Sequence, residues 1–329
     1  MSLPRALGSL LFIAISFLAL RAQDDDPIRV DSSIVRLNVG VVDARGRSIT
    51  TLNRDSFDLY EDGVKQQITR FEPSDAPFSV VIMLDMSGST LSFRQVITQS
   101  AIRFIDALSP NDRIAVIEFY DKINLRNDFT TDRATIYHSI AVSNGRGKTH
   151  FYKALDFALD KLASEKSHRK AIIVLSDGVD TELQDLDRKA LDRVKDDMVA
   201  SALKPEASDA LTRVLSRSDA QGVTIYPLFL PTGDPARLID PTPRQTAMYL
   251  ASKKRVQMIA ERTGGELNAI NRLEDMGRLY AQIAAELRTL YTVEYTPSDA
   301  KRDGKWREIK IGVKNSDYIA RTRPGYYAK

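Results

Sequence analysis

The stretch FSVVIMLDMSGST, residues 78–90, joins a mostly apolar run to an aspartate and serine hydroxyls. An apolar run without polar alternation is typical of a strand that is covered on both faces of a sheet. In sheets built from such strands, ligands bind beyond the carboxyl ends. We therefore predict a central strand over residues 78–84, with Asp85, Ser87 and Ser89 projecting into a ligand crevice.

Three further apolar runs share this character, over residues 114–119, 171–175 and 223–230. Between them, apolar residues recur at helical spacing, for example over residues 96–108 and 152–162. Strands that alternate with helices predict an α/β fold with a doubly wound, mostly parallel sheet. A charged helical stretch over residues 183–221 contains Lys204-Pro205, and we expect the proline to divide it into two helices.

The two ends of the chain predict β structure of a different kind. Residues 34–42 alternate between apolar and polar side chains, and Glu61-Asp62-Gly63 is a hairpin signal between two strand-like runs. Three more strands are expected over residues 290–295, 306–313 and 318–322.

These patterns predict one discontinuous domain that is interrupted by another. Residues 23–75 carry 7 basic and 11 acidic side chains, whereas residues 300–329 carry 9 basic and 3 acidic ones, so their charges permit pairing. An N-terminal segment of about 50 residues has a thin core and needs a partner. We expect residues 23–75 and 290–329 to form a small β-sandwich, with the α/β domain, residues 76–289, inserted between them.

A short leader precedes these segments. Arg5 lies ahead of an apolar run over residues 10–20, and Ala22 shortly precedes the acidic residues 24–26. This order is typical of a secretory signal peptide, so we expect residues 1–22 to be removed and the mature protein to be secreted or periplasmic. An uncleaved membrane anchor is the alternative, although the run is short for a bilayer span of about 20 residues. No later segment is apolar enough to span a membrane.

The composition excludes several kinds of chemistry. The 329 residues include no cysteine and three histidines, which removes thiolate metal sites and thiol nucleophiles and leaves little for imidazole sites. The formal net charge of +3 becomes +1 when Arg5 and Arg21 are lost with the leader. A nucleic-acid partner is therefore not predicted.

The apolar run over residues 171–175 is also followed by an acid. Residues 174–180, VLSDGVD, place Asp177 after the strand, and Asp177 lies beside Asp85 if the two strands are neighbours. Two carboxylates that face each other in a partly dry crevice repel, and a divalent cation between them resolves the repulsion. The loop over residues 144–150 can place the Thr149 hydroxyl on the same ion. A set of aspartate and hydroxyl oxygens favours a hard cation.

Five positions closely resemble the metal-ion-dependent adhesion site of von Willebrand factor type A (VWA) domains, namely Asp85, Ser87, Ser89, Thr149 and Asp177. The resemblance spans roughly residues 76–290. It implies direct contacts of the three hydroxyls with Mg²⁺ or Mn²⁺, and contacts of the two carboxylates either directly or through water. It also implies that an Asp or Glu of a protein partner replaces one water on the cation.

A narrower resemblance concerns the flanking segments. Residues 52–71, with Phe57-x-x-Tyr60-Glu61-Asp62-Gly63, and the closing Arg323-Pro324-Gly325-Tyr326-Tyr327 resemble the bacterial VWFA-related acidobacterial domain proteins. The residues that carry this resemblance come from both of the chain segments that are predicted to form the β-sandwich.

The leading functional hypothesis is a secreted, non-enzymatic module that binds an acidic residue of a protein partner through the cation. The alternative is a structural or assembly component that uses the edge of the β-sandwich, with the metal crevice vestigial; a hydrolase is the third candidate. A phosphate-binding loop at Gly147-Lys148-Thr149 is disfavoured, because Val142 stands where such loops need glycine and a helix is predicted before it. The sequence predicts neither the identity of the partner nor the oligomeric state.

Overall fold

The structure, a computed structural model, describes residues 34–165, 169–270 and 275–328. The predicted signal peptide, residues 1–22, lies outside the described residues. Within the described ranges, no helix combines the length and the apolar character needed to cross a bilayer.

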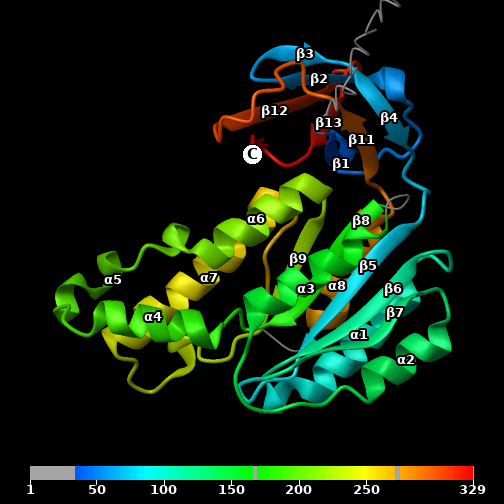
Figure 1. The fold of residues 1–329 in the computed structure, drawn as a ribbon. Coiled ribbons are helices and arrows are strands. Elements are labelled where there is room, and N and C mark those ends of the chain that lie inside the picture. Colours follow the sequence, from blue (N-terminus) through cyan, green and yellow to red (C-terminus); the bar gives the residue numbers. More distant parts are fainter. Residues whose placement is uncertain (1–33, 166–168, 271–274, 329) are drawn as a thin grey trace, which may run out of the picture. The chain divides into compact units, whose positions relative to one another are not determined.

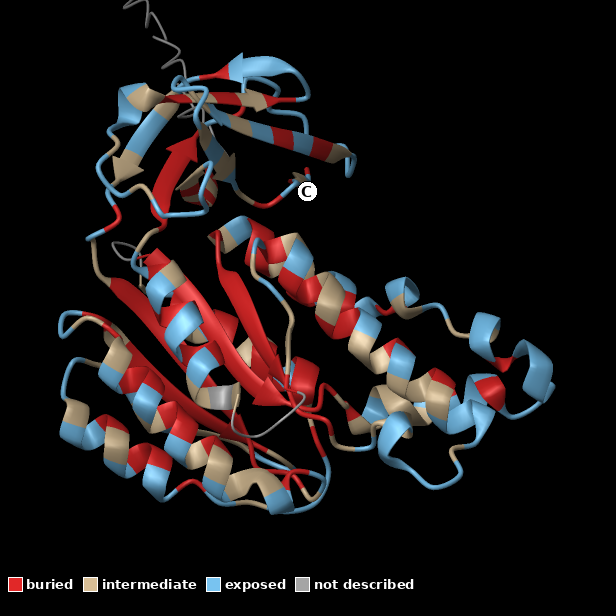
Figure 2. Ribbon diagram, turned by 180° about the vertical axis from the view of Figure 1, so that it is seen from behind, coloured by how far each residue is buried: buried red, intermediate tan, exposed pale blue. Residues whose placement is uncertain are grey.

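A six-stranded sheet forms the centre of the fold, in the order β10-β9-β8-β5-β6-β7 (Figure 1). Its strands are β5 (Phe78–Asp85), β6 (Arg113–Phe119), β7 (Ile123–Thr130), β8 (Arg169–Ser176), β9 (Thr224–Phe229) and β10 (Asn268–Ala269). All neighbours run parallel except β6 and β7. Every residue of β5, β8 and β9 is buried (Figure 2), as expected for strands covered on both faces. The predicted α/β fold with a mostly parallel sheet is confirmed.

Helices cover both faces of this sheet, because successive side chains of a strand point to opposite faces. In β5, Val80 and Ile82 join a core with α1 and α8, whereas Val81 and Met83 join a second core with α3, α6 and α7. The helices are α1 (Arg94–Ala107), α2 (Arg133–Ala141), α3 (Phe151–Ala163), α4 (Thr181–Leu191), α5 (Val199–Ala202), α6 (Asp209–Gln221), α7 (Pro243–Thr263) and α8 (Met276–Leu287).

The charged segment between α4 and α6 is more divided than the sequence predicts. Besides the short helix α5, it contains 3-10 turns, and Pro205 begins one of them, Pro205–Ala207. Proline lacks an N–H group and fits the first position of a helical turn, not its interior. Val199 of α5 packs with Leu191 and Ala247 in a small core of its own, which holds this segment against α7.

Two four-stranded antiparallel sheets pack on a shared core, in the orders β13-β1-β11-β4 and β14-β12-β2-β3. Their strands are β1 (Val35–Asp43), β2 (Phe57–Glu61), β3 (Val64–Gln66), β4 (Ile68–Glu72), β11 (Tyr291–Tyr295), β12 (Trp306–Val313), β13 (Tyr318–Arg321) and β14 (Gly325–Tyr327). Each sheet mixes strands from both ends of the chain, since Val35 pairs with Tyr295 and Glu61 pairs with Ile309. The arrangement is that of a small β-sandwich.

A buried carboxylate organises the interior of this sandwich. Glu61 accepts hydrogen bonds from the hydroxyls of Tyr295, at 2.6 Å, and of Tyr326, at 3.0 Å. Because these residues lie on β2, β11 and β14, one acid joins both sheets.

Arg169, at the start of β8, connects the two segments through which the chain passes between the sandwich and the central domain. These two segments are called the crossings below. Its buried guanidinium donates to the carbonyl oxygens of Ser74, at 2.7 Å, and of Ala76 on the crossing from β4 to β5. It also donates to the carbonyl oxygen of Leu290, on the return crossing from α8 to β11. One cation therefore holds both crossings.

Asp219 on α6 forms a second junction. Its buried carboxylate accepts from the guanidinium groups of Arg323, at 3.0 Å, and of Arg262 on α7, at 2.7 Å. The Arg262 guanidinium also lies over the Trp306 ring, 4.1 Å from its centroid. Ion pairing and stacking thus join the central domain to the C-terminal strands.

Candidate metal centre

The two acids predicted to bind a cation lie at the same edge of the central sheet. β5 and β8 are parallel neighbours, with Leu84 opposite Leu175. Asp85 ends β5, and Asp177 immediately follows β8. The exposed fractions of Asp85 and Asp177 are 0% and 2%, so both carboxyl groups are withdrawn from solvent.

The loop after β5 is held by its own polar groups. The Ser87 N–H donates to the Asp85 carboxylate at 3.0 Å, and the Thr90 hydroxyl donates to the carbonyl oxygens of Asp85, at 2.8 Å, and of Ser87, at 3.1 Å. The hydroxyl oxygens of Ser87 and Ser89 lie 3.1 Å apart. These contacts hold both serine hydroxyls next to Asp85.

Ser176 links the two strand ends and was missed in the sequence. Its hydroxyl donates to the Asp85 carboxylate at 2.5 Å and accepts from the Gly178 N–H at 3.0 Å. The available signal was a polar residue at the end of the otherwise apolar run over residues 171–175. Ser176 fixes one oxygen of Asp85, so it is a positioning residue for the site.

Burial sets the acidity of the two carboxyl groups. Burial and the negative charge of Asp177 raise the pKa of Asp85 to about 7, against the hydrogen bonds from Ser176 and Ser87. Burial also raises the pKa of Asp177, against hydrogen bonds that include one from Ser89. A buried carboxylate pair is unfavourable when both groups are ionised, and a divalent cation offsets both charges.

The Thr149 loop reaches the same edge through backbone contacts. The Gly88 N–H donates to the Gly147 carbonyl oxygen at 3.0 Å. Thr149 is buried and exchanges two hydrogen bonds of 2.9 Å with Thr181, one through its N–H and one through its carbonyl oxygen. The structure therefore brings Thr149 to the edge that carries the two acids and the two serines.

Five residues with oxygen-bearing side chains thus lie at this edge, namely Asp85, Ser87, Ser89, Thr149 and Asp177. Carboxylate and hydroxyl oxygens are the ligands that hard cations prefer. Among the described residues, no three His, Cys, Asp or Glu side chains form a cluster that could hold a metal ion. Serine and threonine hydroxyls have to complete any coordination here, and this donor set fits Mg²⁺ or Mn²⁺.

Gly147→Ala is expected to weaken metal binding while the fold persists. Gly147 has φ +96°, and a Cβ there would lie 2.1 Å from a carboxylate oxygen of Asp121, whose other oxygen accepts from the Lys148 N–H at 2.7 Å. The loop has to shift to accommodate the methyl group, and Thr149 shifts with it. Calorimetric titration with Mn²⁺ measures the effect.

Gly304→Ala is the matched control for this substitution. Gly304 also has a positive φ, +71°, but a Cβ there meets no heavy atom within 4 Å. We expect both variants to lose about 1 kcal/mol of stability from backbone strain, with the loss of Mn²⁺ affinity confined to Gly147→Ala. Equal Mn²⁺ affinity in the two variants would contradict a role for the loop.

The metal-free protein is expected to lose stability as the pH rises from about 4 to about 7. Because the pKa of Asp85 is higher in the folded chain than in the unfolded chain, the proton stabilises the folded state at low pH, and this contribution disappears as the pH passes the folded pKa. Urea unfolding in EDTA, with Asp85→Asn for comparison, measures what the carboxyl group of Asp85 contributes to the pair with Asp177. A difference between the two proteins that is constant with pH would contradict the raised pKa.

The comparison with family models assigns this part of the chain. Residues 80–179 match the model described as von Willebrand factor type A domain. This part of the chain is similar to a VWA domain. The matched range includes all five candidate ligands, from Asp85 to Asp177.

Solved structures similar to this chain have low sequence identity. They include a von Willebrand factor type A protein from Catenulispora acidiphila, with 12% identity, a TM-score of 0.49, and coverage of 84% of this chain and 74% of that chain. An aerotolerance-related membrane protein from Bacteroides fragilis has 16% identity, a TM-score of 0.45, and coverage of 64% and 98%. The pilus adhesin SpaC from Lactobacillus rhamnosus GG has 12% identity, a TM-score of 0.47, and coverage of 89% and 47%. The comparison with curated proteins gave no match.

Proposed function

We propose that this chain is a secreted or periplasmic, non-enzymatic binding module, which captures an Asp or Glu of a protein partner through Mg²⁺ or Mn²⁺. The observation that carries the proposal is the buried pair Asp85 and Asp177. These acids lie at the ends of two adjacent strands, in the part of the chain that matches the VWA family model and also contains Ser87, Ser89 and Thr149. The narrower resemblance to the acidobacterial domain proteins remains a prediction from the sequence.

The charge balance of the site favours an acidic partner. A bound divalent cation supplies a Lewis-acidic position at which a carboxylate oxygen can take the place of water. Asp85 and Asp177 balance the two positive charges, while Ser87, Ser89 and Thr149 add oxygen atoms but no charge. An incoming carboxylate is therefore not repelled by an excess of negative charge in the site.

The surroundings of the serines favour metal binding. The hydroxyl oxygens of Ser87 and Ser89 lie 3.1 Å apart, and these side chains hydrogen-bond to the carboxyl groups of Asp85 and Asp177, respectively. The hydrogen-bonding partners of both serines are therefore other candidate ligands, which supports a role of the serines in binding the cation.

Acetate tests the proposed chemistry without knowledge of the partner. Protein loaded with Mn²⁺ is expected to increase the relaxation rate of the acetate methyl protons, because a carboxylate that replaces water lies next to the paramagnetic ion. Asp85→Asn is expected to remove this effect, and Asp185→Asn, at a half-exposed acid on α4, is expected to retain it.

Two results would overturn the proposal. One is equal acetate relaxation in the wild type and in Asp85→Asn at matched free Mn²⁺. The other is capture of a partner that survives both chelation and Asp177→Ala, which would favour the edge of the β-sandwich as the binding surface.

A further inference from the structure

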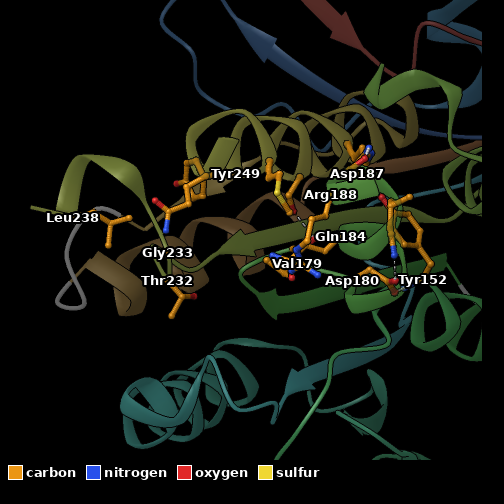
Figure 3. Close-up of a pocket in the computed structure, with 16 residues that line it drawn as sticks. Tyr152, Val179, Asp180, Gln184, Asp187, Arg188, Thr232, Gly233, Leu238 and Tyr249 are labelled. Carbon is orange, nitrogen blue, oxygen red and sulfur yellow. Dashed lines mark hydrogen bonds and ion pairs between the residues drawn. The ribbon is translucent and has the colours of Figure 1, made fainter. Parts of the chain in front are cut away.

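A cavity of about 420 Å³ opens beside the metal-binding loops, between the start of α4 and the middle of α7 (Figure 3). Its apolar wall consists of Tyr152, Val179, Leu183, Leu238, Met248 and Tyr249. This volume lies within the range of roughly 300–1,000 Å³ that is usual for pockets that bind small organic groups.

The cavity borders the loop that carries Asp177 of the candidate metal centre. Gly178 lines the cavity and directly follows Asp177 in the chain. Thr232 also lines the cavity, and its hydroxyl lowers the pKa of Asp177. The Ser252 hydroxyl of α7 donates to the Gly178 carbonyl oxygen at 2.7 Å, which fixes the cavity wall to the loop that carries the acid.

The charged groups of the cavity are already engaged. Asp187 and Arg255 are both buried and form two hydrogen bonds, at 2.6 and 2.7 Å. Asp180 accepts from the Tyr152 N–H, at 3.2 Å, and Arg188 at the rim pairs with Asp185, at 2.5 Å. A charged side chain that entered would lose water without gaining a free counter-charge, so the cavity favours a neutral occupant.

We propose that this cavity receives an aromatic side chain of the partner segment whose carboxylate binds the metal centre. The inference rests on the proposed function, because the metal centre fixes the segment over the cavity. The rings of Tyr152 and Tyr249 offer edge-to-face contacts, and aromatic pairs of this kind gain more than the burial of apolar area alone. The recognised motif is thus an acidic residue and an aromatic residue at a fixed spacing.

Selection from a displayed library of short random peptides, in Mn²⁺, tests this inference. The expected peptides contain Asp or Glu together with Phe, Tyr or Trp at one recurrent spacing. Replacement of the aromatic residue by alanine in a selected peptide is expected to weaken its binding about tenfold, and EDTA is expected to abolish it.

Cavity variants provide the second half of the test. Gln184→Trp fills the cavity, and Leu238→Ala removes part of its wall; each is expected to weaken the selected peptide about tenfold without changing Mn²⁺ affinity. Leu186→Ala, an exposed leucine on α4 that does not line the cavity, is expected to bind the peptide like the wild type.

The failures of the two proposals are distinguishable. Peptides that contain an acid but no recurrent aromatic residue, or that bind Gln184→Trp and the wild type equally, would overturn the cavity inference and leave the proposed function standing. Peptides whose binding withstands both EDTA and Asp85→Asn would overturn the proposed function, and the shared partner segment with it.

Discussion

Asp85→Asn is expected to abolish stabilisation of the protein by Mg²⁺ or Mn²⁺ and to make the metal-free protein more stable above pH 7. The amide keeps the shape of the side chain, its oxygen can still accept from the Ser87 N–H, and the Ser176 hydroxyl can accept from the amide NH₂. It removes one of two buried negative charges, however, and with it the repulsion of Asp177. Loss of this ligand is expected to lower metal affinity by more than about 100-fold.

Thermal unfolding and calorimetric titration measure both effects. At a free metal concentration of about 100 times Kd, the wild type gains about 2.7 kcal/mol of stability, and Asp85→Asn is expected to gain almost none. Asp185→Asn serves as the control, because this half-exposed acid lies outside the site. Equal heats of metal binding in the wild type and in Asp85→Asn would contradict a role for Asp85 as a metal ligand.

Asp219→Ala is expected to lower the free energy of unfolding by about 3–5 kcal/mol. Its carboxylate lies between the guanidinium groups of Arg323 and Arg262, and both the carboxylate and Arg323 are buried. Removal of the acid leaves two neighbouring cations, one of them without a counter-charge in the interior. Denaturant unfolding measures the loss.

A surface ion pair provides the control for this second substitution. Asp185→Ala breaks the pair with Arg188, in which both side chains are about half exposed, and is expected to cost less than about 1 kcal/mol. Mn²⁺ affinity is expected to stay unchanged in Asp219→Ala, since α6 contributes no candidate ligand. A similar loss of stability in both variants would show that the buried junction contributes no more than a surface pair.

The sequence was sufficient where the structure depends on local pattern. The apolar run that became β5 has no polar alternation because helices cover both of its faces. The turn at Asp62 and Gly63 was predictable because both residues adopt positive φ, +48° and +78°, which is the conformation that Asp-Gly favours between hairpin strands. The positions of the five candidate ligands at the edge of the sheet were predictable for the same reason, since each lies next to a strand end or a helix start.

Features that depend on contacts distant in sequence were not predictable. β7 was missed because it is a partly exposed edge strand with mixed polar residues and only Phe129 buried. Arg169 lies in a polar stretch of the sequence, and its carbonyl partners are 93 or more residues away. The cavity combines residues of α4 with Leu238 and Tyr249, from a long segment that carried no recognisable motif.

The hydrogen bonds of Arg169 and the candidate metal centre lie at opposite ends of the paired strands β5 and β8. β5 runs from Phe78, which pairs with Arg169, to the candidate ligand Asp85. A partner bound at Asp85 that pulled away from the sandwich would therefore pull β5 along its own axis. The hydrogen bonds to β6 and β8, which pair along nearly the whole strand, would then be loaded together in shear. The sheet would resist such a pull as a unit, without opening one bond at a time.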